Sequence, residues 1–161
     1  MKLNQISPWT DFKSIGHKLS DEVSSWLLEQ GPITKRIKAQ KNFKLIVHQD
    51  KIDSISNDDY DFIESKSEDF KIRKVTLLGD DSPMVYAESI IPVLTIEKGL
   101  STLGSIGKAP LGDILFLENL FEKVKTVYAS FLAENGSIIW GRKAKYTVNS
   151  QPISVMEIFI L

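Results

Sequence analysis

Hydrophobic and β-branched residues gather in five short segments of the chain, and each segment is bounded by residues that favour turns. This pattern is typical of β-strands, which are predicted at 43–47, 72–78, 84–91, 138–148 and 153–161. Clusters of Gly, Asp, Asn, Ser and Pro at 79–83 and 149–152 are expected to form turns between neighbouring strands. Because consecutive strands usually pair, the sheet is predicted to be mainly antiparallel.

One amphipathic helix is predicted before the first strand. Ser20 suits its N-cap, and Gly31 with Pro32 would end it. Its apolar positions fall on one face and are Leu19, Val23, Trp26 and Leu27. Such a face is expected to pack against the sheet.

Two other segments have a weaker pattern. The apolar spacing of 117–132 favours a helix, whereas 124–128 followed by Asn135-Gly136 is typical of a strand that enters a hairpin. The segment 50–69 is polar and acidic, without strong periodicity, and we interpret it as a solvated connection.

Length, charge and composition narrow the class of protein. A chain of 161 residues fits one domain, 1–161, large enough to enclose a small cavity. The formal net charge of −1, with 20 basic and 21 acidic residues, predicts neither a nucleic-acid partner nor an anionic membrane surface. The absence of cysteine excludes disulfides and thiol chemistry, and no stretch has the composition of a signal peptide or a membrane span. We therefore expect a cytoplasmic protein without membrane insertion.

Glu157 is a candidate site residue because of its neighbours in the last predicted strand. Side chains alternate across a strand, so Ile153, Val155 and Phe159 share its face. A carboxylate among apolar side chains is desolvated, which is typical of acid–base and binding sites. The alternative is that the other face of the strand is buried, and that Glu157 points to water or ends a structural salt bridge.

Arg73 poses the same question in an earlier strand, where it shares a face with Val75 and Leu77. A buried guanidinium requires a carboxylate partner and offers it a planar fork of donors. That partner belongs either to the protein, as an internal ion pair, or to a ligand.

Four groups of motifs carry a resemblance to a known family. They are Trp26-Leu27-Leu28 with Ile33-Thr34-Lys35-Arg36; Arg73-Lys74-Val75-Thr76-Leu77-Leu78 with Asp80 and Pro83; Gly107-Lys108-Ala109-Pro110-Leu111-Gly112 with Leu115-Phe116; and Trp140-Gly141-Arg142-Lys143 with Glu157-Ile158-Phe159. In order and rough spacing they resemble the bacterial chorismate lyase family, from about Trp26 to the end of the chain.

The resemblance implies a fold. This is a single α+β domain, a mainly antiparallel sheet with helices packed on it, and a ligand pocket enclosed under two flap-like segments. It favours a strand for the second half of 117–132 and a flap turn for 104–108, which otherwise looks superficially like part of a phosphate-binding loop but lacks its full spacing.

The resemblance also implies an activity and a site. Members of the family split chorismate into 4-hydroxybenzoate and pyruvate, at the entry to ubiquinone synthesis, as monomers without a metal or cofactor. Carried over by position, Arg73 clamps the ligand carboxylate and Glu157 meets the ring hydroxyl at the opposite end of the pocket. The backbone N–H groups of Ile33 and Leu111 help to hold the ligand. Whether Glu157 acts as a general acid or only as a hydrogen-bonding group is left open.

One position departs from the family pattern, because Glu88 stands where an arginine is usual. If Glu88 lies across the hairpin from Arg73, it would occupy the guanidinium and weaken substrate binding. If it lies exposed near a flap opening, then Lys35, Lys108 or Arg142 would take over the electrostatic task.

Several other functions are less compatible with the residues. The same fold serves as the effector-sensing domain of some transcription regulators, so the runner-up is a non-catalytic domain that binds a small aromatic carboxylate. About twenty residues precede the first predicted helix, too few for a helix-turn-helix unit. His17 and His48 are far apart and lack metal-ligand spacing. The remaining basic groups are interpreted as solvated faces, and they are Lys35-Arg36, Lys38, Lys41, Arg142-Lys143 and Lys145.

Overall fold

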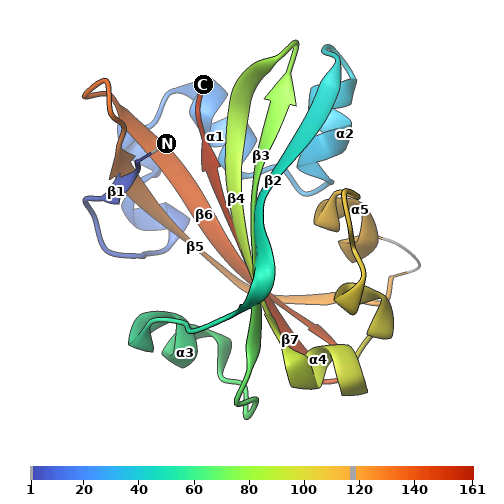
Figure 1. Ribbon diagram of the computed structural model, residues 1–161. Helices are drawn as coiled ribbons and strands as arrows, with labels where there is room; N and C mark the ends of the chain where they lie inside the picture. Colours follow the sequence, from blue (N-terminus) through green and yellow to red (C-terminus); the bar gives the residue numbers. More distant parts are fainter. Residues whose placement is uncertain (1, 117–118) are drawn as a thin grey trace.

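The computed structural model describes residues 2–116 and 119–161 of the chain. Its centre is one seven-stranded antiparallel sheet in the order β1-β5-β6-β7-β4-β3-β2 (Figure 1). The strands are β1 Asn4–Gln5, β2 Phe43–Asp53, β3 Phe70–Gly79, β4 Ser82–Pro92, β5 Glu122–Leu132, β6 Ile138–Val148 and β7 Gln151–Phe159. The α-helices are α1 Asp21–Leu27, α2 Ile33–Lys38, α3 Asn57–Ile63, α4 Val93–Lys98 and α5 Leu111–Leu115. Short 3-10 turns lie at η1 Phe12–Ser14, η2 Gly16–Lys18 and η3 Ser101–Gly104. The expected α+β fold with a mainly antiparallel sheet is thus confirmed.

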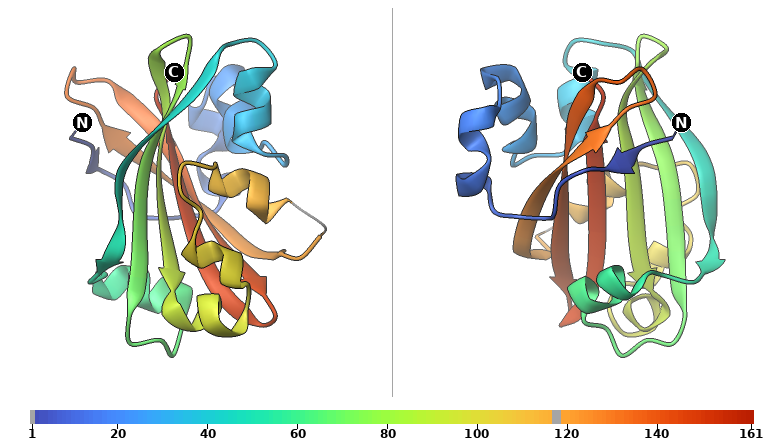
Figure 2. Two further views of the ribbon diagram at one scale, coloured as in Figure 1. Left: turned by 45° about the vertical axis from the view of Figure 1, so that its right-hand side comes forward. Right: turned by 90° about the vertical axis from the view of Figure 1, so that its left-hand side faces the viewer.

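Hydrophobic side chains cover both faces of this sheet. On the inner face, which includes Val75, Ala87 and Val155, the core is completed by α1, α2, α4, α5 and the segment around η3. On the outer face, which includes Ile72 and Ile90, it is completed by α3 and the N-terminal segment. Figure 2 shows α2, α4 and α5 on one side of the sheet and α3 on the other.

The first predicted helix is present as α1, but it ends at Leu27, before the expected stop at Gly31 and Pro32. Both predicted turns are confirmed. Ser20 caps α1, because its hydroxyl accepts a hydrogen bond from the N–H of Val23 at 3.2 Å. The β3–β4 turn places Asp80 and Asp81 at positive φ, and the β6–β7 turn does the same at 149 and 150. Two successive residues at positive φ match the right-handed twist of a hairpin, and Asp and Asn tolerate that conformation best.

The interpretation of 50–69 as a solvated connection is wrong. Strand β2 continues to Asp53, and α3 follows with Ser56 as its N-cap. The buried face of this helix is narrow, with Ile63 fully buried against Phe70 and Ile72. A helix of seven residues, about two turns, with mostly polar side chains leaves little periodicity to detect.

Strand β5 begins at Glu122, so the expectation of a strand in the second half of 117–132 is confirmed. Residues 117 and 118, which the alternative helix would have included, lie outside the described residues. The pairing of β5 with β6 shifts register between Lys123 and Lys125, which is a β-bulge at Val124.

No helix in the described ranges is long and apolar enough to cross a membrane.

Candidate functional site

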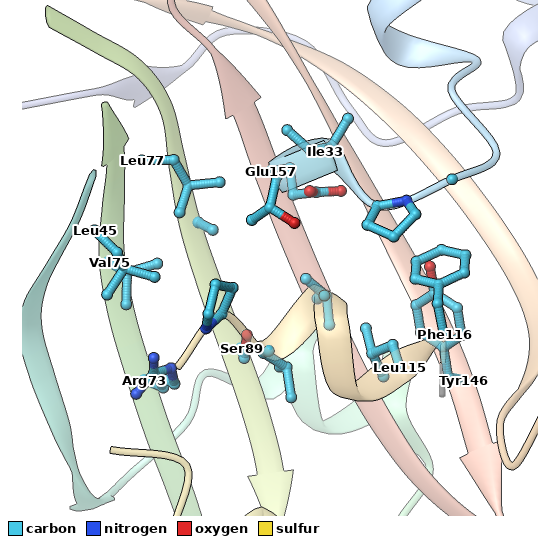
Figure 3. Close-up of a pocket in the computed structure, with 18 of the residues that line it drawn as sticks. Ile33, Leu45, Arg73, Val75, Leu77, Ser89, Leu115, Phe116, Tyr146 and Glu157 are labelled. Atoms are coloured by element: carbon cyan, nitrogen blue, oxygen red, sulfur yellow. The ribbon is translucent and has the colours of Figure 1, made fainter. Parts of the chain in front are cut away.

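A cavity of about 50 Å³ lies on the inner face of the sheet, beneath α2 and α5. Its floor is formed by residues of β2, β3, β4, β7 and β6, which are consecutive in the sheet. Figure 3 shows Arg73 on one side of this cavity, Phe116 and Tyr146 on the other, and Glu157 between them. The cavity is lined by Gly31, Pro32, Ile33, Thr34, Leu45, Arg73, Val75, Leu77, Ala87, Ser89, Pro110, Leu111, Gly112, Leu115, Phe116, Arg142, Tyr146, Val155 and Glu157.

The four residues that the family resemblance assigns to ligand binding all line this cavity: Ile33, Arg73, Leu111 and Glu157. The sheet register explains the two charged residues. Arg73 lies opposite Ser89, which lies opposite Val155, and Val155 shares a face with Glu157 two residues later. Both charged side chains therefore point to the inner face. Of the two alternatives for Glu157, exposure to water is wrong, whereas a salt bridge within the protein is present, with Arg142.

Ile33 and Leu111 occupy equivalent places above the cavity. Each is the first residue of its helix and each follows a proline N-cap, at Pro32 and Pro110. The first N–H groups of a helix have no acceptor within the helix. In the described part of the chain neither N–H donates to another protein group.

The two segments that cover the cavity are tied to each other. The hydroxyl of Thr34 in α2 donates a hydrogen bond of 2.7 Å to Asp113 Oδ1 in α5. Thr34 is buried, so this bond is shielded from water. The lid of the cavity is thus one connected layer made of two segments that are distant in sequence.

Arg73 is only 1% exposed and binds protein groups as well as facing the cavity. Its Nη1 donates to Asp50 Oδ2 at 3.3 Å and to the carbonyl of Gly107 at 2.7 Å, and its Nη2 donates to the carbonyl of Ala109 at 2.7 Å. Burial lowers the pKa of Arg73, and the nearby Asp50 opposes that shift. The guanidinium therefore anchors the loop before α5 and has an internal carboxylate partner.

Lys71 lies two residues before Arg73 in β3 and likewise binds Asp50 and two backbone carbonyls. Its ammonium lies 3.1 Å from Asp50 Oδ1 and donates to the carbonyls of Leu103 and Gly104 at 3.2 and 3.3 Å. Lys71 and Arg73, both in β3, together hold the segment 103–109 against the inner face of the sheet with four hydrogen bonds to backbone carbonyls. Two cations share one carboxylate at this end of the cavity.

Ser89 is a site residue that the sequence did not indicate. It is 4% exposed, lines the cavity and pairs directly with Arg73 across β3 and β4. Its hydroxyl has no hydrogen-bond partner among residues 2–116 and 119–161, although the atom is not sealed off from the cavity. The only signal in the sequence would have been its register opposite Arg73.

Glu157 is held by Arg142, its direct partner across β6 and β7. Arg142 Nε donates to Glu157 Oε1 at 2.9 Å, and Nη1 donates to the carbonyls of Leu27 and Glu29 at 3.1 and 2.7 Å. Arg142 is 6% exposed, and its guanidinium lies 5.6 Å from the ring centroid of Phe159. It fixes both the carboxylate and the end of α1, which leads into the lid.

Tyr146 closes the end of the cavity opposite Arg73 (Figure 3). Burial, reinforced by the negative charge of Glu157 and opposed by Arg142, raises the pKa of Tyr146 to about 12. The phenol therefore stays neutral and keeps a proton to donate.

Glu88 lies on the outer face of the sheet, which corrects both interpretations of this residue. It pairs with Lys74 and Met156, whereas Arg73 pairs with Ser89. Glu88 thus neither meets Arg73 nor sits at an opening of the cavity. It lines a second cavity with Asp59 and Lys143, and burial there raises its pKa, with the charge of Asp59 adding to the shift and Lys74 opposing it.

The basic residues fall into two groups. Lys35, Lys38 and Lys41 are exposed, as predicted, and Lys108 is exposed too; neither Lys35 nor Lys108 lines the cavity. The prediction of a solvated face is wrong for 142–145, where Arg142, Lys143 and Lys145 are all buried.

The error has a physical cause in strand β6. The aliphatic stems of these side chains are covered by α1 on one face and by α3 on the other, while their charges pair with carboxylates. Lys143 lies 3.4 Å from Asp59 Oδ1 and Lys145 lies 3.0 Å from Glu64 Oε1.

Metal coordination has no obvious place in the described residues. No group of three or more His, Asp or Glu side chains is close enough together to hold an ion there. His48 instead bonds its Nε2 to the hydroxyl of Thr76 at 2.7 Å.

Solved structures with a similar fold belong to transcriptional regulators. The C-terminal domain of the histidine utilization repressor from Pseudomonas syringae pv. tomato superimposes with a TM-score of 0.58 at 11% identity, covering 73% of this chain and 91% of that one. A putative GntR-family transcriptional regulator gives a TM-score of 0.57 at 12% identity, covering 82% of this chain and 63% of that one. At such low identity these similarities establish the fold alone.

Sequence comparison identifies closer relatives. A probable chorismate pyruvate-lyase from Psychromonas ingrahamii is 29% identical over 155 residues, covering 88% of this chain and 83% of the relative. One from Photobacterium profundum is 30% identical over 139 residues, covering 84% and 76%, and the chorismate pyruvate-lyase of Hamiltonella defensa is 28% identical, covering 99% and 90%. The family described as Chorismate lyase matches residues 4–161. The chain therefore belongs to the chorismate lyase family.

Proposed function

We propose that this protein is a chorismate pyruvate-lyase, which eliminates pyruvate from chorismate to give 4-hydroxybenzoate. The observation that carries the proposal is the meeting of Ile33, Arg73, Leu111 and Glu157 around one cavity, from four separate parts of the chain. These are the positions that the family resemblance assigns to ligand binding. The cavity is apolar between its two charged ends, as a planar ring requires.

In the proposed complex the ring carboxylate lies at Arg73 and the C4 hydroxyl lies at Glu157. Nε of Arg73 has no protein partner in the described residues, and the hydroxyl of Ser89 lies opposite it on β4. Both are donors, and a carboxylate accepts several hydrogen bonds. The N–H groups of Ile33 and Leu111 add contacts from above.

Glu157 is better placed to accept a hydrogen bond than to act as a general acid. Its Oε1 already accepts a hydrogen bond from Arg142 Nε at 2.9 Å, and no described residue donates to its Oε2, which is left to accept one from a ligand. We therefore assign it the task of accepting the hydrogen bond of the substrate hydroxyl, which fixes the ring about its long axis.

The reaction requires no oxidant, metal or organic cofactor. The bond between C3 and the ether oxygen breaks, C4 loses its proton, and the released enolpyruvate gains a proton at its methylene carbon to become pyruvate. Loss of the side chain makes the ring aromatic. The protein then contributes orientation and electrostatic stabilisation of the departing enolate, rather than covalent chemistry.

We further propose that the segments 31–34 and 104–112 act as flaps. They cover the cavity, so a ligand enters or leaves only when they separate from the sheet. Slow release and inhibition by 4-hydroxybenzoate are expected consequences. In this proposal the enzyme acts as a cytoplasmic monomer at the entry to ubiquinone synthesis.

The direct test mixes the purified protein with chorismate and follows 4-hydroxybenzoate and pyruvate. We expect turnover in the wild type, and a loss of at least about a hundredfold in kcat/KM for Arg73→Ala and Glu157→Gln. Lys108→Ala is the matched control, because Lys108 is exposed and outside the cavity lining. Absence of turnover in a protein that binds 4-hydroxybenzoate would refute the lyase assignment.

The alternative is a protein that binds an aromatic carboxylate without chemistry. Two observations support this alternative. Similar folds occur in transcriptional regulators. Three of the five N–H donors of Arg73 already bind protein groups, which leaves fewer for a substrate. Binding of 4-hydroxybenzoate and chorismate with no product formed would be the outcome expected of such a protein.

A further inference from the structure

Two lysines of strand β5 face opposite sides of the sheet although they are two residues apart. Residues i and i+2 of a regular strand share a face. Here the bulge at Val124 intervenes, so that Lys123 pairs with Tyr146 and Lys125 pairs with Lys145. The extra residue reverses the alternation, and Lys123 is thereby directed to the inner face.

The surroundings of the two ammonium groups confirm this reversal. Lys123 Nζ lies 5.8 Å from the ring centroid of Tyr146, which lines the cavity. Lys125 Nζ lies 4.8 Å from the ring centroid of Phe62 and 3.9 Å from Glu64, both of them beside the outer face. Lys123 is exposed and is not itself part of the cavity lining, but it stands behind Tyr146 on the inner side, whereas Lys125 lies on the opposite side of the sheet.

The two ends of the cavity carry similar sets of charges. At one end, Lys71 and Arg73 flank the carboxylate of Asp50. At the other end, Arg142 binds Glu157, and Lys123 stands behind Tyr146. Each end thus combines two cations with one carboxylate, which leaves an excess of about one positive charge at each. At the second end this excess is partly open to water, because Lys123 is exposed whereas Arg142 is buried. An excess of positive charge attracts anions, so each end suits one anionic group of a ligand.

The end formed by Tyr146 also has free donors. Nη2 of Arg142 and the hydroxyl of Tyr146 have no hydrogen-bond partner within the described ranges, and neither atom is sealed off by protein. Burial lowers the pKa of Lys123, the positive charge of Arg142 adds to the shift, and Glu157 opposes it.

Chorismate is the ligand with a matching pair of anionic groups. It has one carboxylate on the ring and a second on the enolpyruvyl group, which is attached at C3 beside the C4 hydroxyl. When the hydroxyl lies at Glu157, the enolpyruvyl group must lie at the same end of the cavity. We propose that Lys123, together with Arg142 and Tyr146, binds the carboxylate of the enolpyruvyl group and selects the dianionic substrate over its monoanionic product. This inference rests on the proposed function.

The test compares Lys123→Met with Lys125→Met, since the two substitutions remove the same charge from neighbouring positions on opposite faces. For Lys123→Met we expect a rise of about tenfold or more in the KM for chorismate, with the Kd for 4-hydroxybenzoate within about twofold of the wild type. Lys125→Met should leave both constants within about twofold. Lys123→Arg, which keeps the charge, should recover most of the loss.

Other results would overturn the inference. If Lys123→Met weakens chorismate and 4-hydroxybenzoate equally, the residue acts on the fold of the cavity and not on the second carboxylate. If neither constant changes, Lys123 does not contact the substrate. A melting temperature for each variant separates loss of fold from loss of contact.

Failure of the proposed function gives a different result. If the wild type binds chorismate without turnover, the lyase assignment fails, and the same variants are then compared by titration calorimetry with chorismate and 4-hydroxybenzoate. Selective loss of chorismate affinity in Lys123→Met still supports the second carboxylate site. A wild type that binds 4-hydroxybenzoate but not chorismate overturns both proposals.

Discussion

Arg73 and Arg142 each donate hydrogen bonds to one carboxylate and to two backbone carbonyls. In each case the carbonyls belong to a segment next to the lid of the cavity, so each arginine links the site to its cover. A lysine cannot reproduce this pattern, because its ammonium is a compact point charge without a planar fork of donors. At the residue scale, ligand recognition and closure of the lid therefore depend on the same side chains.

Arg142→Met tests this double task. The substitution leaves Glu157 without its cationic partner and two carbonyls without donors, so we expect about 3 kcal/mol lower stability and weaker binding of 4-hydroxybenzoate. Denaturation by urea measures the first effect and calorimetry the second. Arg36→Met is a useful control, because Arg36 also stacks on an aromatic ring, that of Trp26, but away from the cavity. Equal stability of the two variants would contradict the assignment.

Individual site residues differed in how far the sequence could identify them. Arg73 and Glu157 were recognisable as candidates because each stands among apolar residues of one strand. Alternation left open which face is buried, and the family resemblance decided between the two faces. Ser89 and Tyr146 have no such anomaly in the sequence, and their place depends on which strands become neighbours. Lys123 depends on a bulge, which shifts register by one residue and has no clear signature in a run of alternating residues.

At the scale of elements, the strands and tight turns were predictable, whereas the short helices were not. Helices α4 and α5 have six and five residues, too few for a 3.6-residue period to be detected. Their stability comes from tertiary contacts, including the link between Thr34 in α2 and Asp113 in α5. The lid is therefore the part of the molecule where sequence patterns say least.

Thr34→Val should loosen this lid while preserving its shape. Removing the hydroxyl leaves Asp113 without its buried partner, so we expect about 1 kcal/mol lower stability and faster dissociation of 4-hydroxybenzoate. Stopped-flow displacement of the ligand measures the rate. Thr34→Ser keeps the hydroxyl and should dissociate at nearly the wild-type rate. A dissociation rate unchanged in Thr34→Val would show that the contact between α2 and α5 does not limit release.

On the scale of the whole molecule, the sheet separates two sets of charged groups. Glu88, Lys143 and Asp59 lie on the outer face, and the proposed binding groups lie on the inner face. Glu88, which stands where the family usually has an arginine, is therefore expected to affect the stability of the fold rather than ligand binding. Its consequences should be visible in unfolding experiments and absent from binding experiments.

Glu88→Gln makes this separation measurable. Since burial raises the pKa of Glu88 in the folded state, the folded protein binds this proton more tightly than the unfolded chain does, and stability falls as the pH rises through that interval. At neutral pH the glutamine variant should be more stable by about 1 kcal/mol or less, and the difference should vanish below about pH 4, where both states are protonated. The Kd for 4-hydroxybenzoate should not change. A weaker Kd would place Glu88 in contact with the site after all.

The order of strands has a consequence for how the molecule holds together. Strands β2, β3 and β4 form one meander and β5, β6 and β7 another, and the pairing of β4 with β7 is the seam where the two meet. Arg73 and Ser89 come from the first half, whereas Arg142, Tyr146 and Glu157 come from the second. A ligand that contacts both ends of the cavity therefore binds both halves of the sheet and should oppose their separation along the β4–β7 pairing. Saturation with 4-hydroxybenzoate should then slow amide hydrogen exchange across the β4–β7 ladder more than within either half, and uniform protection of the sheet would show that the halves never separate on their own.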